Sequence, residues 1–149
     1  MSDSLSHVDA EGRVRMVDVG GKELSRRRAV ATATVRMRAE TARQLRALPK
    51  GDAFVTAQLA GIVAAKKTSE LIPLCHPLPI SHVELTLDVG EAHVEIVGTV
   101  ETTAQTGVEM EALVAVSVAA LTVYDMAKAI DKEMTVEGVR LLEKSKEPL

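Results

Sequence analysis

The chain has 149 residues, of which 46% are hydrophobic and 26% charged, a balance typical of one globular domain and not of a disordered chain. Only 1% of the residues are aromatic, which excludes a stacking platform for single-stranded nucleic acid. Residues 1–67 hold 13 Lys and Arg against 7 Asp and Glu, whereas residues 68–149 hold 5 against 14. This asymmetry indicates an anion site in the first half, or attraction between the halves within or between subunits.

The first half of the chain is predicted to contain an arm, a strand and two helices. Residues 1–12 are polar, unlike a signal peptide, and we expect a mobile N-terminal arm ahead of a single domain at 13–149. Apolar residues alternate with polar ones over 28–38, which predicts a half-buried strand. A short helix at 40–48 is stopped by proline. Asp52 is the candidate N-cap of a longer helix, apolar nearly all round, that we expect to be buried.

The second half is predicted to add a hairpin, a long helix and a last strand. Three prolines keep residues 71–79 extended, and alternation over 83–100 predicts an antiparallel hairpin with one wet face. A capping box at 106–109 opens a helix that runs to about residue 130, and a strand follows at 134–142. The order β-α-α-β-β-α-β predicts an α+β fold, a ferredoxin-like antiparallel sheet with helices packed on one face. A sheet with one open face favours association of subunits.

Several classes of site are absent from the sequence. It contains no nucleotide-binding loop of the P-loop or Rossmann type, no zinc-protease motif and no nucleophile elbow. Cys75 is the single cysteine, so no internal disulfide can form, and nothing accompanies it at metal-ligand spacing. No run of about 18 apolar residues lacks a charge or a proline. We therefore expect a cytoplasmic protein that binds no metal, no nucleic acid and no membrane.

A few polar residues stand out from their surroundings. Asp125 and Lys128 lie three residues apart near the end of an apolar helix, so they share a face. They form a simple helix ion pair, or a carboxylate and an ammonium held for proton transfer and phosphate binding. Lys66 follows Leu59 and Ile62 on a face expected to be buried, where it would need an anion partner; the alternative is a cation that stabilises a helix end.

Cys75, His76 and Glu111 are further candidates. Cys75 and His76 lie in the extended, proline-bounded segment, where they face a pocket or are ordinary buried residues. Glu111 is a functional acid or a solvated residue of the first helical turn. It precedes Asp125 by 14 residues, about 21 Å along a helix, so a subunit interface would have to supply both to one pocket. These residues indicate an oligomer suited to a phosphorylated ligand, but they name no reaction.

Seven segments, in order, resemble one known family. They are MVDVGGK (16–22), KGD (50–52), AQLAGIVAAKKT (57–68), LIPLCHPL (71–78), TGVEMEAL (106–113), VAALTVYDMAKA (118–129) and VRLLEKS (139–145). Together they are similar to the molybdenum cofactor biosynthesis protein C family, the cyclic pyranopterin monophosphate synthases, from about residue 7 to residue 145. The resemblance implies a lyase that converts 3′,8-cyclo-7,8-dihydroguanosine 5′-triphosphate to cyclic pyranopterin monophosphate and releases pyrophosphate. It also implies a homohexamer, a trimer of dimers, with active sites at subunit interfaces.

The resemblance also implies which residues act. Asp125 matches the catalytic acid/base and Lys128 its partner, and Lys66 matches a pocket residue that we count with these two as catalytic. The matching substrate-binding residues are Leu74, Cys75, His76, Met110, Glu111, Lys50, Lys144 and Arg27, although Arg26 and Arg28 flank the last of these. No cofactor is implied, and a need for Mg²⁺ stays open.

One departure from the family is visible, and two other interpretations remain. Family members commonly continue into a glycine-rich tail where this sequence reads KSKEPL, so if that tail closes the pocket we expect a different closure here. The main alternative function is a non-catalytic nucleotide-binding regulatory module of similar fold, which would leave Asp125 idle. A purely structural oligomeric scaffold would bind no ligand at all.

Overall fold

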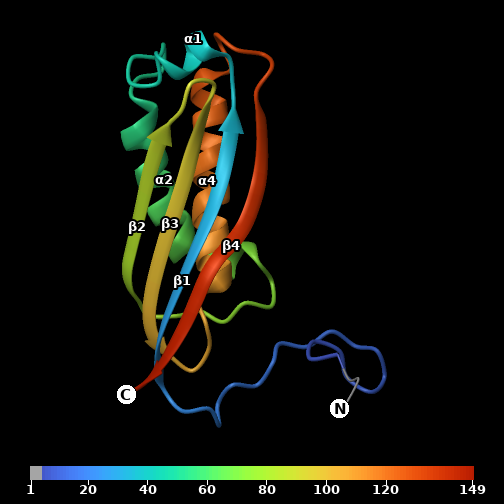
Figure 1. The fold of residues 1–149 in the computed structure, drawn as a ribbon. Coiled ribbons are helices and arrows are strands. Elements are labelled where there is room, and N and C mark those ends of the chain that lie inside the picture. Colours follow the sequence, from blue (N-terminus) through green and yellow to red (C-terminus); the bar gives the residue numbers. More distant parts are fainter. Residues whose placement is uncertain (1–4) are drawn as a thin grey trace.

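The computed structural model describes residues 5–149 and confirms the predicted α+β sandwich. Its elements are β1 (Ser25–Arg36), α1 (Ala39–Ala42), α2 (Ala53–Lys66), α3 (Thr68–Leu71), β2 (Ile80–Val89), β3 (His93–Ala104), α4 (Glu109–Ala127) and β4 (Thr135–Pro148). The strands form one antiparallel sheet in the order β2-β3-β1-β4, and α2 and α4 cover one of its faces (Figure 1). This is the ferredoxin-like arrangement, with the one-turn helix α3 as an addition that the sequence pattern did not predict.

The predicted alternation in the central strand β1 is confirmed only for the side that faces the helices. Ala29, Ala31, Ala33 and Val35 are buried against the helices. The opposite face is only partly wet, because Val30 and Thr32 on it are buried as well. There Arg28 forms ion pairs with glutamates of both neighbouring strands, β3 and β4. Such exposed pairs contribute little to stability, so the sheet is held mainly by its apolar face.

Helices α2 and α4 approach each other closely because small residues line their contact. A Cβ added at Gly61 of α2 would lie 3.0 Å from the backbone oxygen of Ala115 of α4 and even closer to Leu85 of β2. Helix α4 has the length and apolar composition of a membrane span, but ten of its 19 residues are buried within the sandwich. It is therefore the core helix of this fold.

The prediction that α2 is buried nearly all round is wrong. It buries its small residues, whereas Val55, Leu59 and Val63 are each about half exposed on the side away from α4. Lys66 is also exposed, so the expected buried-face lysine is not found. The reason is that composition alone does not say which side of an evenly apolar helix meets its neighbours.

Helix ends follow the predictions in part. Asp52 caps α2, and its carboxylate accepts the backbone N–H groups of Phe54 and Val55. The capping box predicted for α4 is wrong, because Val108 is the N-cap and no side chain caps this end. The carboxylate of Glu109 instead folds back over Gly107. Helix α1 has four residues rather than the predicted nine, and the chain continues through tight turns before α2.

The N-terminal segment runs past the end of the sandwich at which β1 begins (Figure 1). Residues 1–4 of the predicted arm lie outside the described residues. The following residues form a small hairpin, in which Val8 bridges Val14 and Asp9 accepts the backbone N–H groups of Glu11 and Arg13. The mobility of this arm stays a prediction.

Candidate active site

Asp125 lies between two lysines at the C-terminal end of α4. Its Oδ1 is 2.8 Å from the Nζ of Lys128, and its Oδ2 is 2.9 Å from the Nζ of Lys50. The shared face predicted for Asp125 and Lys128 is confirmed. Lys50 comes from the turn between α1 and α2, far away in the sequence, so the fold completes a carboxylate held by two ammonium groups.

The charges of this cluster depend on one another. The hydrogen bond from Lys128, followed by that from Lys50, lowers the pKa of Asp125 to about 2. The same contact raises the pKa of Lys128. All three side chains are about half exposed, so a ligand can reach them. An anion that binds here would contact the ammonium groups of Lys50 and Lys128, which at present share the single carboxylate of Asp125.

A tight turn presents Lys50 to this cluster. Leu48 and Gly51 exchange backbone hydrogen bonds across the turn. Gly51 has a φ of +118°, a conformation that a residue with a Cβ rarely adopts. The Ala53 N–H then donates to the Leu45 carbonyl, which ties the start of α2 to the preceding turns. The backbone geometry of the turn therefore decides where Lys50 points.

Most of the other predicted site residues line a cavity at the opposite end of the sandwich. This cavity has a volume of about 370 Å³, and its lining includes Leu74, Cys75, His76, Met110 and Glu111. The extended segment 72–79 and the start of α4 supply these residues.

The N-terminal segment forms another wall of this cavity. The Nε2–H of His76 donates to the backbone carbonyl of Val17 at 2.6 Å, which holds the two segments together. Lys22 and His7 also line the cavity. Neither residue was predicted from the sequence to belong to the site. Lys22 lies within one of the segments that carry the family resemblance, and this was the signal that could have found it.

Glu111 is buried between this cavity and a smaller one that Lys66 and His76 also line. Burial, together with the nearby charge of Glu109, raises its pKa to about 7 in spite of a hydrogen bond from its own backbone. Burial also raises the pKa of the Cys75 thiol, and Glu111 adds to that effect. Cys75 is therefore a thiol at neutral pH, and Glu111 titrates near neutrality.

Replacing Glu111 with glutamine is expected to flatten the pH dependence of stability. The folded-state pKa of about 7 lies above the ordinary glutamate pKa of 4.5. The wild type therefore holds its full stability below pH 4.5 and loses roughly 3 kcal/mol as the pH rises through 7. Glutamine stays neutral, so urea unfolding at pH 5 and pH 8, at one protein concentration, should show the loss only in the wild type. The exposed Glu70→Gln is the matched control, and a pH dependence unchanged by Glu111→Gln would contradict the prediction.

Arg27 and Lys144 lie near the same end as the cavity, on β1 and β4. They line a shallow hollow with Glu109, whose carboxylate is 3.8 Å from the Nζ of Lys144. Along β1, Arg27 alternates with Arg26 and Arg28, so it shares the sheet face of Ala29 and the helices. Arg26 and Arg28 belong to the open face. Of the three arginines, Arg27 is therefore the one that we favour as the site residue.

The predicted site residues therefore form two groups. Lys50, Asp125 and Lys128 lie at one end of α4, and the other eight lie around its beginning. The rise of a helix places Glu111 and Asp125 about 21 Å apart. Within residues 5–149, no group of three or more His, Cys, Asp or Glu is arranged to hold a metal ion.

Comparisons with known proteins agree on one family. Residues 16–147 match the MoaC family. The chain is 58% identical over 149 residues to the cyclic pyranopterin monophosphate synthase of Roseiflexus sp. (strain RS-1), covering 97% of this chain and 94% of that protein. The proteins of the same name from Roseiflexus castenholzii and Nostoc sp. are 56% and 53% identical, over 97% of this chain and 94% and 88% of their own lengths.

Proposed function

The chain belongs to the MoaC family, and we propose that it converts 3′,8-cyclo-7,8-dihydroguanosine 5′-triphosphate to cyclic pyranopterin monophosphate with release of pyrophosphate. The observation that carries the proposal is the carboxylate of Asp125 held between Lys50 and Lys128 in a chain so similar to synthases of that name. It is a lyase of molybdenum cofactor biosynthesis.

With a subunit interface that brings them to one nucleotide, the two groups of residues suit different tasks in this reaction. Lysines neutralise the triphosphate and the charge that develops on the departing pyrophosphate. Electrostatic stabilisation of this kind usually makes a large contribution to catalysis. Asp125 moves protons during the rearrangement of the purine ring. The cavity beside Glu111 and His76 offers donors and acceptors for the polar edges of the base. The alternative of a regulatory nucleotide-binding module would use the two lysines to bind phosphate but would leave Asp125 idle.

Turnover of the cyclised nucleotide tests the proposal. Purified protein is incubated with the nucleotide, and pyrophosphate and the pterin product are measured together. Equal amounts of both are expected. Binding of the nucleotide without either product would contradict the enzymatic function and favour the regulatory module. Adding EDTA to the same assay tests our proposal that no metal or other cofactor is required, since lysines supply the positive charge.

We further propose a homohexamer, a trimer of dimers in the cytoplasm, with each active site shared between subunits. Val55, Leu59 and Val63 on α2, with Leu121 and Tyr124 on α4, leave apolar area in contact with water. Its burial by another copy would stabilise an assembly.

The expected mass in light scattering at micromolar concentration is six subunits of 15.9 kDa. A clean monomer under these conditions would contradict both the hexamer and the shared site. The same measurement at high salt separates apolar association, which persists, from attraction between the basic and acidic halves, which weakens.

A further inference from the structure

Asp131 is a buried carboxylate to which the proposed reaction gives no role. It lies just beyond α4, where its N–H donates to the carbonyl of Ala127 at 3.1 Å. Its side chain has no exposed area. A buried carboxylate is costly unless hydrogen bonds replace the lost water, so its partners explain why it is tolerated there.

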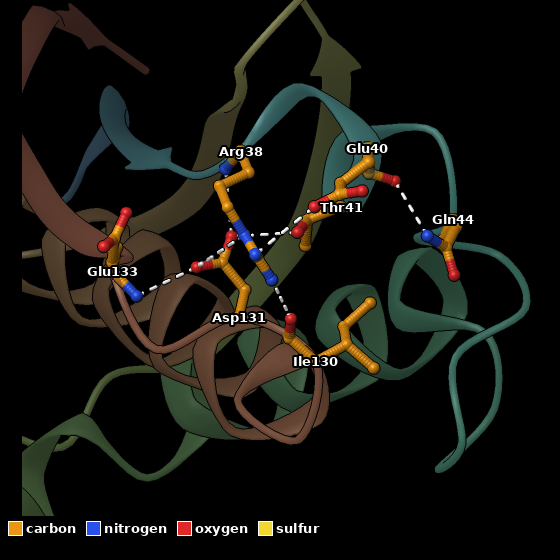
Figure 2. A network of polar contacts seen from close by, with 7 residues as sticks. All are labelled: Arg38, Glu40, Thr41, Gln44, Ile130, Asp131 and Glu133. Atoms are coloured by element: carbon orange, nitrogen blue, oxygen red, sulfur yellow. Dashed lines mark hydrogen bonds and ion pairs between the residues drawn. The ribbon is translucent and has the colours of Figure 1, made fainter.

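Hydrogen-bond donors from two separate stretches of the chain surround this carboxylate (Figure 2). Oδ2 accepts the backbone N–H of Arg38 and the hydroxyl of Thr41, each at 2.9 Å, and Oδ1 accepts the backbone N–H of Glu133 at 2.9 Å. The Arg38 guanidinium lies 3.7 Å from Oδ1 and also donates to the Ile130 carbonyl. Burial alone raises the pKa of Asp131, but these contacts outweigh it and the pKa is lowered. The side chain of Asp131 is therefore ionised, and each of its two oxygens accepts hydrogen bonds.

These contacts join the two stretches of chain that carry the Asp125 cluster. Arg38 is the N-cap residue of α1 and Thr41 lies within α1, which leads into the turn that presents Lys50. Asp131 itself continues the chain from Lys128. Helix α1 has four residues and no side-chain cap, and so short a helix does not persist without tertiary contacts.

The reacting side chains are not themselves held by packing. Asp125, Lys50 and Lys128 are each about half exposed, so their mutual geometry depends on where their backbones are placed. The carboxylate of Asp131 is a direct link between the two backbones. An apolar residue would fill the same space but would leave buried donors on both segments without an acceptor.

We propose that Asp131 is a positioning residue that holds the α1 segment against the end of α4 and thereby keeps Lys50 in contact with Asp125. The positioning rests on the contacts above, and its effect on catalysis rests on the proposed function. Asp131 does not reach the ligand, because it is buried.

The first test needs no substrate. Asp131→Asn keeps the size of the side chain but replaces one carboxylate oxygen with an amide NH₂ group. This group cannot accept a hydrogen bond from the donors that it faces, so the link to α1 weakens. With Lys50 released, the pKa of Asp125 is expected to rise from about 2 towards the ordinary aspartate pKa of 3.8. Carboxyl NMR titration of aspartate-labelled protein measures this value, and an Asp125→Asn sample assigns the signal. Asp9→Asn, at a hydrogen-bonded turn in the N-terminal segment, is the matched control and should leave the Asp125 titration unchanged.

Thr41 provides a milder pair of variants in case Asp131→Asn does not fold. Thr41→Val removes only the hydroxyl donor and should shift the pKa of Asp125 in the same direction by less. Thr41→Ser keeps the donor and should restore the wild-type titration. An unchanged Asp125 titration in folded Asp131→Asn, or in Thr41→Val where the first variant fails to fold, would overturn the proposal.

The second test separates positioning from general stability. Asp131→Asn is expected to lower kcat on the order of 10- to 100-fold in the wild-type background. In a Lys50→Met background it should lower kcat little further, since the contact it maintains is already lost. Equal factors in both backgrounds would mark a merely structural role and overturn the proposal. If the Asp125 titration shifts as expected but the wild type turns over no nucleotide, the proposed function fails and the positioning stands.

Discussion

An Asp125→Asn enzyme is expected to release pyrophosphate about 10²–10⁴ times more slowly than the wild type while it keeps its fold and assembly. Asparagine preserves the size of the side chain and one acceptor oxygen, but it cannot take up or return a proton. The side chain is about half exposed, so little packing is lost. Rates are measured at saturating nucleotide, with circular dichroism and native mass to confirm the assembly.

A pKa of about 2 makes Asp125 a weak base in the ligand-free protein. An effective general base has a pKa near the working pH. Because Lys128 and Lys50 hold the pKa of Asp125 down, phosphate oxygens that compete for these lysines would release the carboxylate and raise its pKa. Substrate binding would then prepare Asp125 to accept a proton, and the same lysines would serve both purposes.

The control for Asp125→Asn is Asp88→Asn, the same substitution at an exposed position on β2. That variant is expected to release pyrophosphate at the wild-type rate. Near-normal release by Asp125→Asn would remove Asp125 from proton transfer and leave Lys50 and Lys128 as an electrostatic site only.

Local patterns in the sequence were sufficient for the order and nature of the main elements. Alternation placed Ala29 and Ala31 on the side of the helices, because neighbouring residues of a strand face opposite sides, but it did not predict that Val30 between them is buried too. Asp52 was predictable as a cap because its effect is confined to the next two or three residues. The burial of α2 was not predictable, since the helix is apolar on several sides and the positions of α4 and of the sheet decide which side is covered. The capping box failed because α4 begins with Val108 as its cap.

The candidate site was predictable to the extent that it is local. Asp125 and Lys128 face each other because residues three apart on a helix are neighbours. No spacing rule could bring Lys50 to Asp125, since the fold alone joins residues so far apart in the sequence, and only the resemblance pointed to it. The burial of Glu111 likewise depends on segments from elsewhere in the chain, which cover the first turn of α4.

Lys66 and Asp125 lie at opposite ends of the sandwich. Helices α2 and α4 run antiparallel with Gly61 against Ala115, so Lys66 is level with the beginning of α4. Asp125 is level with the beginning of α2, roughly 20 Å away by the rise of a helix. One small pocket of a single chain does not include both residues. If both act on one nucleotide, Lys66 of one protomer must meet Asp125 of another.

Mixed assemblies of Lys66→Ala and Asp125→Ala chains are therefore expected to recover activity that neither parent has. When the chains are unfolded, mixed equally and refolded, about one interface in four carries both wild-type residues, so pyrophosphate release should approach a quarter of the wild-type rate. The matched control mixes Asp125→Ala with Lys128→Ala. Those two residues belong to one chain's cluster, so every site stays defective and no recovery is expected. Native mass measurements verify that mixed assemblies form. If these are no more active than their parents, Lys66 and Asp125 do not act together across an interface, and the interface has only a structural role for this pair.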